Sequence, residues 1–158
     1  MRRPWNLVES SVYSLATLSA QGVPNYNICT YVMAISRLPK LYAIALQSNT
    51  LTCQNALETS TAVLQHLSSD HAQWIRRLGK QSGRSYDKCK SLHRAKALER
   101  WKEFDVLTNC LSYVHLTKMD SRETGDHHLF TYRATGYKTL SDTGGLTFSE
   151  LVENGYIL

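Results

Sequence analysis

Three polar residues, Ser48, Asn49 and Thr50, stand directly before a segment with helical character that runs to about Glu58. The free amide groups and the dipole at the start of a helix favour an anion, and nearby hydroxyl groups add donors. Phosphate binding is the chemistry that this arrangement would support. The same residue types also serve as plain helix caps, so the segment alone leaves both interpretations open.

A second candidate anion site is the glycine-bracketed loop from Gly79 to Arg84, which contains Lys80 and Ser82. Lys80 can supply a point charge and Ser82 a hydrogen-bond donor to a phosphate group. The loop is not a Walker A motif, because its spacing differs and no strand precedes it. An exposed basic loop that binds nothing is the alternative.

Metal chemistry is not indicated by the spacing of the potential ligands. The four cysteines form no CxxC pair of the kind found in zinc ribbons and redox motifs; they are Cys29, Cys53, Cys89 and Cys110. Four of the histidines also lack ligand spacing and are interpreted as structural or solvated: His66, His71, His93 and His115. We therefore predict no metal site.

The composition is that of a globular protein. The chain has 158 residues, of which 42% are hydrophobic and 20% charged, and we predict a single domain over residues 1–158. The absence of CxxC spacing, together with a start that lacks a long apolar run, favours a reducing, cytoplasmic location. The longest apolar stretch, Leu38 to Leu46, is too short to cross a bilayer, so no membrane association is expected.

Positive charge is concentrated between residues 76 and 102. The formal net charge is +5, and ten lysines and arginines lie in this stretch, offset only in part by three acidic residues, Asp87, Glu99 and the adjoining Glu103. Such a stretch can meet nucleic acid, the phosphates of a cofactor, or only solvent. A nucleic-acid-binding barrel is the least favoured of these, because the aromatic residues of a stacking platform are not interleaved with the charges.

The elements that position the candidate site residues are predicted to be mostly strands. The patterns predict strands over residues 12–19, 26–36, 40–47, 61–67, 106–107, 111–119 and 129–137. Helices are expected over about 50–58, over 70–78 with Asp70 as N-cap and Gly79 as stop, over 91–101, and after a capping box at Thr147. A polar hairpin loop is expected over 120–126. Without regular βαβ alternation, this order favours a mainly β fold, a closed Greek-key antiparallel barrel with a few inserted short helices.

Three ordered segments resemble the flavin reductase family, whose members bind FMN, sometimes FAD, in a split β-barrel and use NADH or NADPH. They are residues 14–39, with Asn27 to Tyr31 inside; Leu46 to Thr50; and Gly125-Asp-His127 with the strand that follows. Two positions depart from the family pattern. Lys40 stands in place of a second proline, and Arg133 to Gly136 replaces a Gly-Glu-Val strand, which bears on the contact with the reductant.

The resemblance implies roles for individual residues. Asn27, Cys29 and Thr30 would run along the isoalloxazine ring, where backbone amides and short polar side chains can satisfy the polar ring edge; the alternative is a strand with polar residues facing solvent. Residues 48–50 would bind the flavin phosphate, and the loop with Lys80 and Ser82 would close over it. His127 would stand beside the nicotinamide or the flavin face as the catalytic residue.

The function implied is hydride transfer from NADH or NADPH to flavin by a homodimer that shares its flavin sites, with no nucleic-acid partner. Stacking and orientation matter more for this step than an acid or base, because the cofactors supply the chemistry. The alternative, left open by the altered strand at Arg133 to Gly136, is a flavin-binding electron-transfer module without NAD(P)H oxidase activity.

Overall fold

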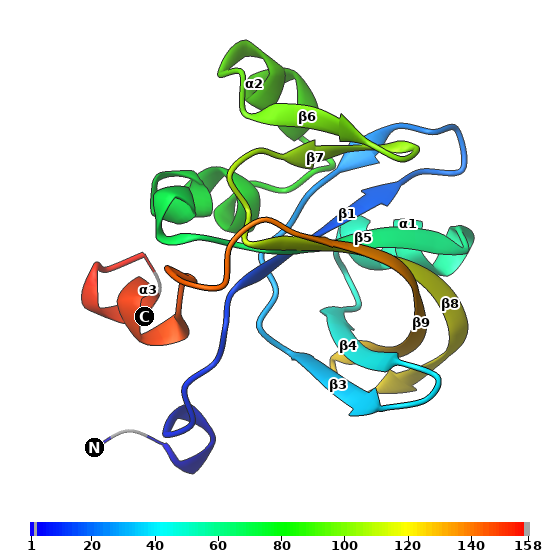
Figure 1. Ribbon diagram of the computed structural model, residues 1–158, viewed down its shortest axis with the longest axis horizontal. Helices are drawn as coiled ribbons and strands as arrows, with labels where there is room; N and C mark the ends of the chain where they lie inside the picture. The colour runs from blue at the N-terminus through cyan, green and yellow to red at the C-terminus, as the bar shows by residue number, and fades with distance from the viewer. Residues whose placement is uncertain (2, 157–158) are drawn as a thin grey trace.

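The structure is a computed structural model that describes residues 1 and 3–156 (Figure 1). Its strands are β1 (Tyr13–Leu18), β2 (Pro24–Asn25), β3 (Val32–Ser36), β4 (Leu41–Gln47), β5 (Thr61–His66), β6 (Leu98–Trp101), β7 (Phe104–Leu107), β8 (Ser112–Thr124) and β9 (His127–Thr139). Its helices are α1 (Leu51–Glu58), α2 (Lys88–Arg94), α3 (Phe148–Glu153), the 3-10 helices η1 (Pro4–Asn6) and η2 (Ser69–Trp74), and the π-helix η3 (Arg76–Lys80).

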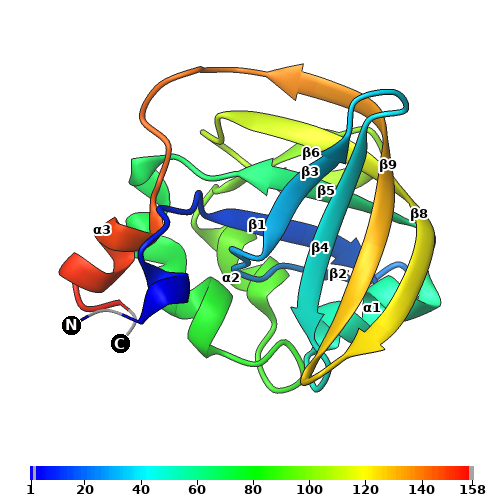
Figure 2. The ribbon, with the colours of Figure 1, turned by 90° about the horizontal axis from the view of Figure 1, so that it is seen from below.

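Seven strands form one curved antiparallel sheet in the order β2-β1-β5-β8-β9-β4-β3, while β6 and β7 form a separate hairpin. Figure 2 shows how the long strands β8 and β9 bend around the barrel. The mainly β prediction is confirmed, but the predicted closure is wrong. The short strands β2 and β3 are left as edges, because the chain between them, residues 26–31, forms no strand of its own. It meets the sheet at isolated points, a bridge between Tyr13 and Cys29 and a hydrogen bond from the amide of Ala45 to the carbonyl of Tyr31.

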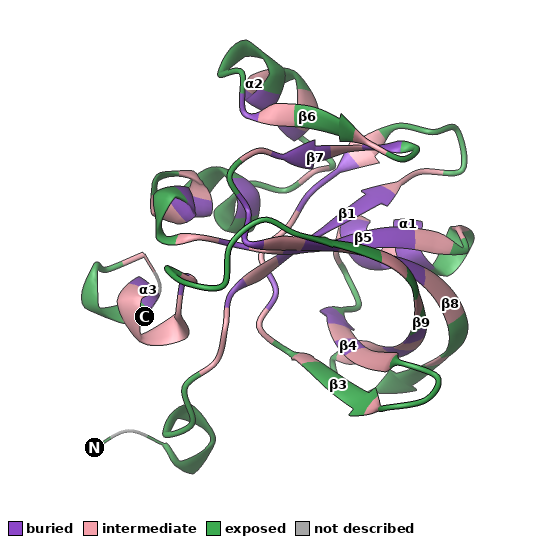
Figure 3. Cartoon of the chain, viewed as in Figure 1, coloured by how far each residue is buried: buried purple, intermediate pink, exposed green. Residues whose placement is uncertain are grey.

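The core lies on both faces of the central strands β1 and β5, whose inner residues are all buried (Figure 3). Successive side chains of a strand point to opposite faces, so Val63 packs in one hydrophobic cluster and Leu64 in another. The first cluster lies between the sheet, the β6–β7 hairpin and the helical segments. The second fills the barrel and includes Phe130 and Tyr132. Strands buried on both faces need not alternate between apolar and polar residues. β5 accordingly has the apolar run Ala62 to Leu64, whereas β1 also buries the polar residues Ser14 and Thr17.

The segment before the basic stretch differs from the predicted helix. Its N-cap is Ser68, not Asp70, and the cap is completed by the side chain of His71. His71 is buried and its Nε2 lies 2.8 Å from the carbonyl oxygen of Thr108. The helix also passes through Gly79 instead of stopping there. A histidine in the third position is not part of the usual capping box, so the pattern did not indicate this start.

Two further boundaries differ from the predictions. The helix expected over 91–101 is α2 followed by strand β6, because Lys96 adopts a left-handed conformation (φ 53°) that ends the helix. The polar segment 120–126 is mostly paired strand, and only Gly125 and Asp126 form the turn of the β8–β9 hairpin. Gly125 has φ 61°, a conformation that glycine adopts without a steric penalty.

The predicted helix starts at Thr50 and Thr147 are confirmed. Each hydroxyl accepts a hydrogen bond from the backbone three residues later, and Glu150 completes the capping box of α3. Among the residues that the structure describes, none of the helices has the length and apolar character needed to cross a membrane.

Candidate functional site

A cavity of about 420 Å³ lies where four parts of the chain meet. Its lining comes from the segment 25–31 between two strands, from the end of β4 and the start of α1, from residues 78–83 together with Lys88, and from His127 at the start of β9. Eight of the nine predicted site residues line it: Asn27, Cys29, Thr30, Asn49, Thr50, Lys80, Ser82 and His127. Ser48 does not. Its hydroxyl oxygen lies 3.4 Å from Nδ1 of His128, outside the lining.

The first wall, residues 26–31, presents main chain more than side chains. The side-chain oxygen of Asn27 accepts a hydrogen bond of 2.8 Å from the amide of Leu15. The main-chain amide and carbonyl of Cys29 are both hydrogen-bonded to the main chain of Tyr13. Burial raises the pKa of the Cys29 thiol to about 12, so the thiol stays protonated. Within the described part of the chain, the main-chain groups of Ile28 and Thr30 have no hydrogen-bond partner. These groups are therefore available to a ligand.

The second wall is the start of α1. The hydroxyl of Thr50 is occupied by the cap, since it donates to the carbonyl of Gln47 at 2.7 Å and accepts from the amide of Cys53 at 3.2 Å. The amides of Leu51 and Thr52 have no acceptor among the described residues. The helix end therefore offers two backbone donors and a positive dipole end to an anion, in place of the hydroxyl predicted for this role.

The third wall is the loop that contains Lys80 and Ser82, both exposed. The hydroxyl of Ser82 accepts a hydrogen bond of 3.2 Å from the amide of Arg84, which shapes the turn. Gly83 packs so closely that a Cβ there would lie 2.9 Å from Cδ2 of Leu51 and still nearer the side-chain oxygen of the buried Asn25. The loop can approach α1 this closely only because residue 83 lacks a side chain.

Lys88 was not predicted, although it joins two of these walls. It is only 6% exposed, and its Nζ donates hydrogen bonds of 2.8 Å to the carbonyl of Tyr26 and 2.7 Å to that of Leu78. Burial lowers the pKa of its ammonium group to about 8. Its sequence surroundings give no signal of this role, because it is one of ten cations in the basic stretch and only tertiary packing buries it.

His127 lies at the mouth of the cavity, beside Gln47 in the pairing of β9 with β4. Its Nδ1 is 2.6 Å from a carboxylate oxygen of Asp126, and its ring centroid is 5.3 Å from that of Tyr31. The hydrogen bond to His127 holds the pKa of Asp126 below its usual value. This pair fixes the orientation of the imidazole, while His128 lies on the opposite face against Phe130.

Solved structures with the same fold come from several bacteria. The chain superimposes with a TM-score of 0.80 on an NADH:FAD oxidoreductase of Streptomyces globisporus in complex with NAD and FAD fragments, at 15% identity over 93% of this chain and 85% of that one. An FMN-binding protein from Thermus thermophilus gives 0.78 at 16% identity, with 94% and 86% covered. A flavin reductase domain protein from an Arthrobacter species gives 0.73 at 13%, with 89% and 83% covered.

These neighbours confirm the split-barrel fold with short inserted helices. No curated protein sequence matches the chain. The family model described as "flavin reductase like domain" matches residues 5–151, which include every segment that lines the cavity. The chain therefore belongs to the flavin reductase like domain family.

Proposed function

We propose that this protein binds FMN in the cavity between α1 and residues 26–31 and transfers a hydride to it from NADH or NADPH. The observation that carries the proposal is the convergence, in one cavity of about 420 Å³, of unpaired main-chain groups, free helix amides, a cationic loop and an oriented histidine. FAD is the alternative flavin, since the exposed loop with Lys80 leaves room for a longer phosphate chain to reach solvent.

The residues present fit a flavin nucleotide. The main-chain groups of Ile28 and Thr30 would meet the polar edge of the ring, and the amides of Leu51 and Thr52 would meet the phosphate together with Lys80. Gly83 lets the loop pack against α1, where a Cβ would clash with Leu51 and Asn25. Bound flavin supplies the electron-accepting chemistry.

The contribution of the protein to the reaction is orientation. His127, held by Asp126 and beside the ring of Tyr31, would border the open side of the cavity, where a nicotinamide ring can stack. A protonated imidazole at this place would also stabilise negative charge on a reduced ligand. Held in place by the protein, two reactants avoid much of the entropic cost of a bimolecular encounter.

The direct test is an absorption spectrum of the purified protein, followed by FMN titration and anaerobic mixing with NADH or NADPH. Flavin bands, or saturable quenching of FMN fluorescence, followed by bleaching with a nicotinamide reductant, are expected. Binding without bleaching would favour the electron-transfer module. Its main support in the sequence, the altered strand Arg133 to Gly136, lies outside the lining of the cavity. Absence of FMN and FAD binding would contradict both functions.

Substitution of His127 by alanine is expected to slow flavin reduction by roughly 10- to 100-fold in stopped-flow traces with NADH, because orientation carries the rate. FMN affinity should stay within a few fold. His128→Ala is the matched control and should change little, since that side chain lies on the other face. Equal behaviour of the two variants, or loss of FMN binding in His127→Ala alone, would assign a structural role to His127.

A homodimer is proposed through the free edge of β3. The three central residues of β3, Met33 to Ile35, are exposed, and Tyr31, Met33 and Ile35 present exposed apolar side chains. Tyr31 also lines the cavity, so a partner docked on this edge would cover the mouth beside His127. Unpaired edges with apolar side chains are ready templates for pairing with another chain.

Light scattering should therefore give twice the chain mass of 17.9 kDa at micromolar concentration. Met33→Asp places a charge on the proposed interface and should yield a folded monomer. A monomeric wild-type protein would contradict the assignment. The single domain over residues 1–158 and the cytoplasmic location remain predictions; the four free cysteines are consistent with a reducing compartment.

A further inference from the structure

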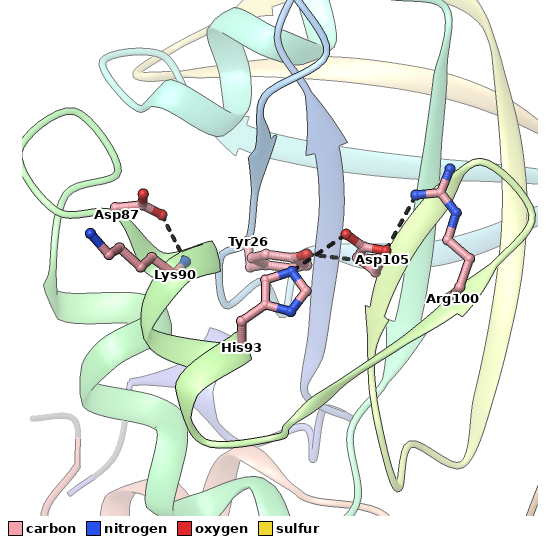
Figure 4. A network of polar contacts seen from close by, with 6 residues as sticks. All are labelled: Tyr26, Asp87, Lys90, His93, Arg100 and Asp105. Carbon is pink, nitrogen blue, oxygen red and sulfur yellow. Dashed lines mark hydrogen bonds and ion pairs between the residues drawn. The ribbon is translucent and has the colours of Figure 1, made fainter.

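A second group of functional side chains lies away from the cavity, between α2 and the β6–β7 hairpin. Cys89 and His93 are four residues apart on α2 and therefore share one face of the helix. Asp105 of β7 faces them, and the ligand atoms of the three side chains all lie within 4.8 Å of one another. Figure 4 shows the imidazole of His93 directed at the carboxylate of Asp105.

The spacing suits a tetrahedral metal ion. Ligand atoms that bind zinc at about 2.0–2.3 Å lie roughly 3.3–3.7 Å from one another in a tetrahedral arrangement. The distance between Nε2 of His93 and Oδ2 of Asp105 is already 3.6 Å. The thiol sulfur needs to move by about 1 Å at most to complete the set. Rotation about the side-chain bonds of Cys89 and His93 can provide a shift of this size.

Asp105 is held in a ligating orientation by its neighbours (Figure 4). Its Oδ1 accepts a hydrogen bond of 3.2 Å from Arg100, which leaves Oδ2 turned toward His93. Its main-chain oxygen accepts a hydrogen bond of 2.9 Å from the hydroxyl of the buried Tyr26. Such outer contacts fix ligand orientation and raise metal affinity.

The charge and accessibility of the group also suit a divalent ion. The side chain of His93 is 57% exposed and that of Asp105 25% exposed, so an ion can reach the group from solvent. In the bound state a thiolate and a carboxylate together balance the charge of one divalent cation, so the loaded site is neutral. Sulfur and imidazole ligands select zinc over magnesium or calcium.

We propose that Cys89, His93 and Asp105 form a zinc-binding site whose fourth position is open to water. The thiol loses its proton to solvent when the zinc–sulfur bond forms, as thiolate ligation requires. The ion would link α2 to β7. Cysteine spacing alone does not show this group, because only one of its ligands is a cysteine and the third comes from another element.

Cobalt is the probe of choice, because a Co²⁺–thiolate bond gives a charge-transfer absorption band in the near ultraviolet. The full chain, freed of metal with a chelator, is titrated with Co²⁺ and then with Zn²⁺. The wild type should show the band, and zinc should abolish it. Zinc at 100-fold its Kd should also raise the Tm by about 5–10 °C.

The variants identify the ligands. Cys89→Ser should lose the band, and His93→Ala should weaken cobalt binding at least tenfold. Because the side chain of His93 is exposed, the His93→Ala variant should keep the wild-type fold, which circular dichroism checks. Cys53→Ala and His128→Ala, outside the group, should bind cobalt as the wild type does. A wild type without the band, or a band that survives in Cys89→Ser or is unchanged in His93→Ala, would overturn the proposal. Flavin titration of the same samples is independent of these outcomes.

Discussion

Replacement of Gly83 by valine is expected to weaken FMN binding by about 100-fold. A Cβ at this position would lie 2.9 Å from Cδ2 of Leu51 and closer still to the side chain of Asn25. Asn25 cannot yield easily, because it is buried and its Nδ2 donates a 2.9 Å hydrogen bond to the hydroxyl of Thr52. The loop must therefore move away from α1, and it takes Lys80 with it.

The size of this effect follows from the cost of overpacking. Extra atoms in a tightly packed place cost about 1–3 kcal/mol, and about 2.7 kcal/mol corresponds to a 100-fold change in affinity. Fluorescence titration with FMN measures it directly. Gly79→Ala, in η3 just before the loop, is the matched control: its Cβ would lie 3.3 Å from Cγ1 of Ile28, a side chain that can adjust. FMN affinity in Gly83→Val equal to that in Gly79→Ala would show that the loop takes no part in binding.

Replacement of Lys88 by methionine is expected to lower the free energy of unfolding by about 2–4 kcal/mol near pH 9.5. The substitution removes the donor from the carbonyls of Tyr26 and Leu78, and each buried unsatisfied group costs about 1–3 kcal/mol. Near pH 7 the loss of stability should be smaller. At this pH the wild type buries a charged ammonium group, and methionine removes that cost, which partly offsets the lost hydrogen bonds.

The pH dependence of this difference has a defined sign. The pKa of Lys88 is lowered to about 8 in the folded protein from 10.5. Between these values the unfolded chain holds a proton that the folded protein has released, so the stability due to Lys88 rises with pH through this window. A neutral amine still has two N–H groups for the two carbonyls. The stability gap between the wild type and Lys88→Met should therefore widen from pH 8 to pH 10.

Urea unfolding at a series of pH values measures this gap. Lys90→Met is the control, since Lys90 is an exposed lysine on the same helix and its side chain makes no contact with the cavity. It should change stability little at any pH. A gap for Lys88→Met that is constant or narrows above pH 8 would show that the buried ammonium group does not titrate in this range.

The sequence predicted those elements whose signals are local. β5 was expected over 61–67 and is observed over Thr61–His66, and α1 follows Thr50, whose hydroxyl is a local cap. β6 was missed because the pattern of its four residues predicts the end of a helix. These residues form a strand only because they pair with β7 across the turn at Lys102. The cap made by Ser68 and His71 was missed because it depends on the burial of His71.

The residues of the candidate site were predicted to lie together from the family resemblance and not from the sequence pattern. Periodicity cannot say which strand ends and loops meet, and the lining residues come from positions as far apart as Asn25 and His127. The resemblance placed eight of nine residues around one cavity, and their roles remain predictions. The resemblance did not indicate Lys88 and Asn25, because their roles depend on burial and on hydrogen bonds to residues distant in the sequence.

The unpaired main chain at Ile28 and Thr30, with the free amides of Leu51 and Thr52, has a consequence for how this fold diverges. A ligand held through peptide groups constrains the path of the backbone and places few demands on side-chain identity. Side-chain substitutions that preserve the path of the backbone then leave ligand binding unchanged. Superposition at a TM-score of 0.80 with only 15% identity shows how far the sequence can change while the path of the backbone is kept. Among proteins that share this fold, we expect selection to act on insertions and on the positions of glycines more strongly than on the side chains that face the ligand.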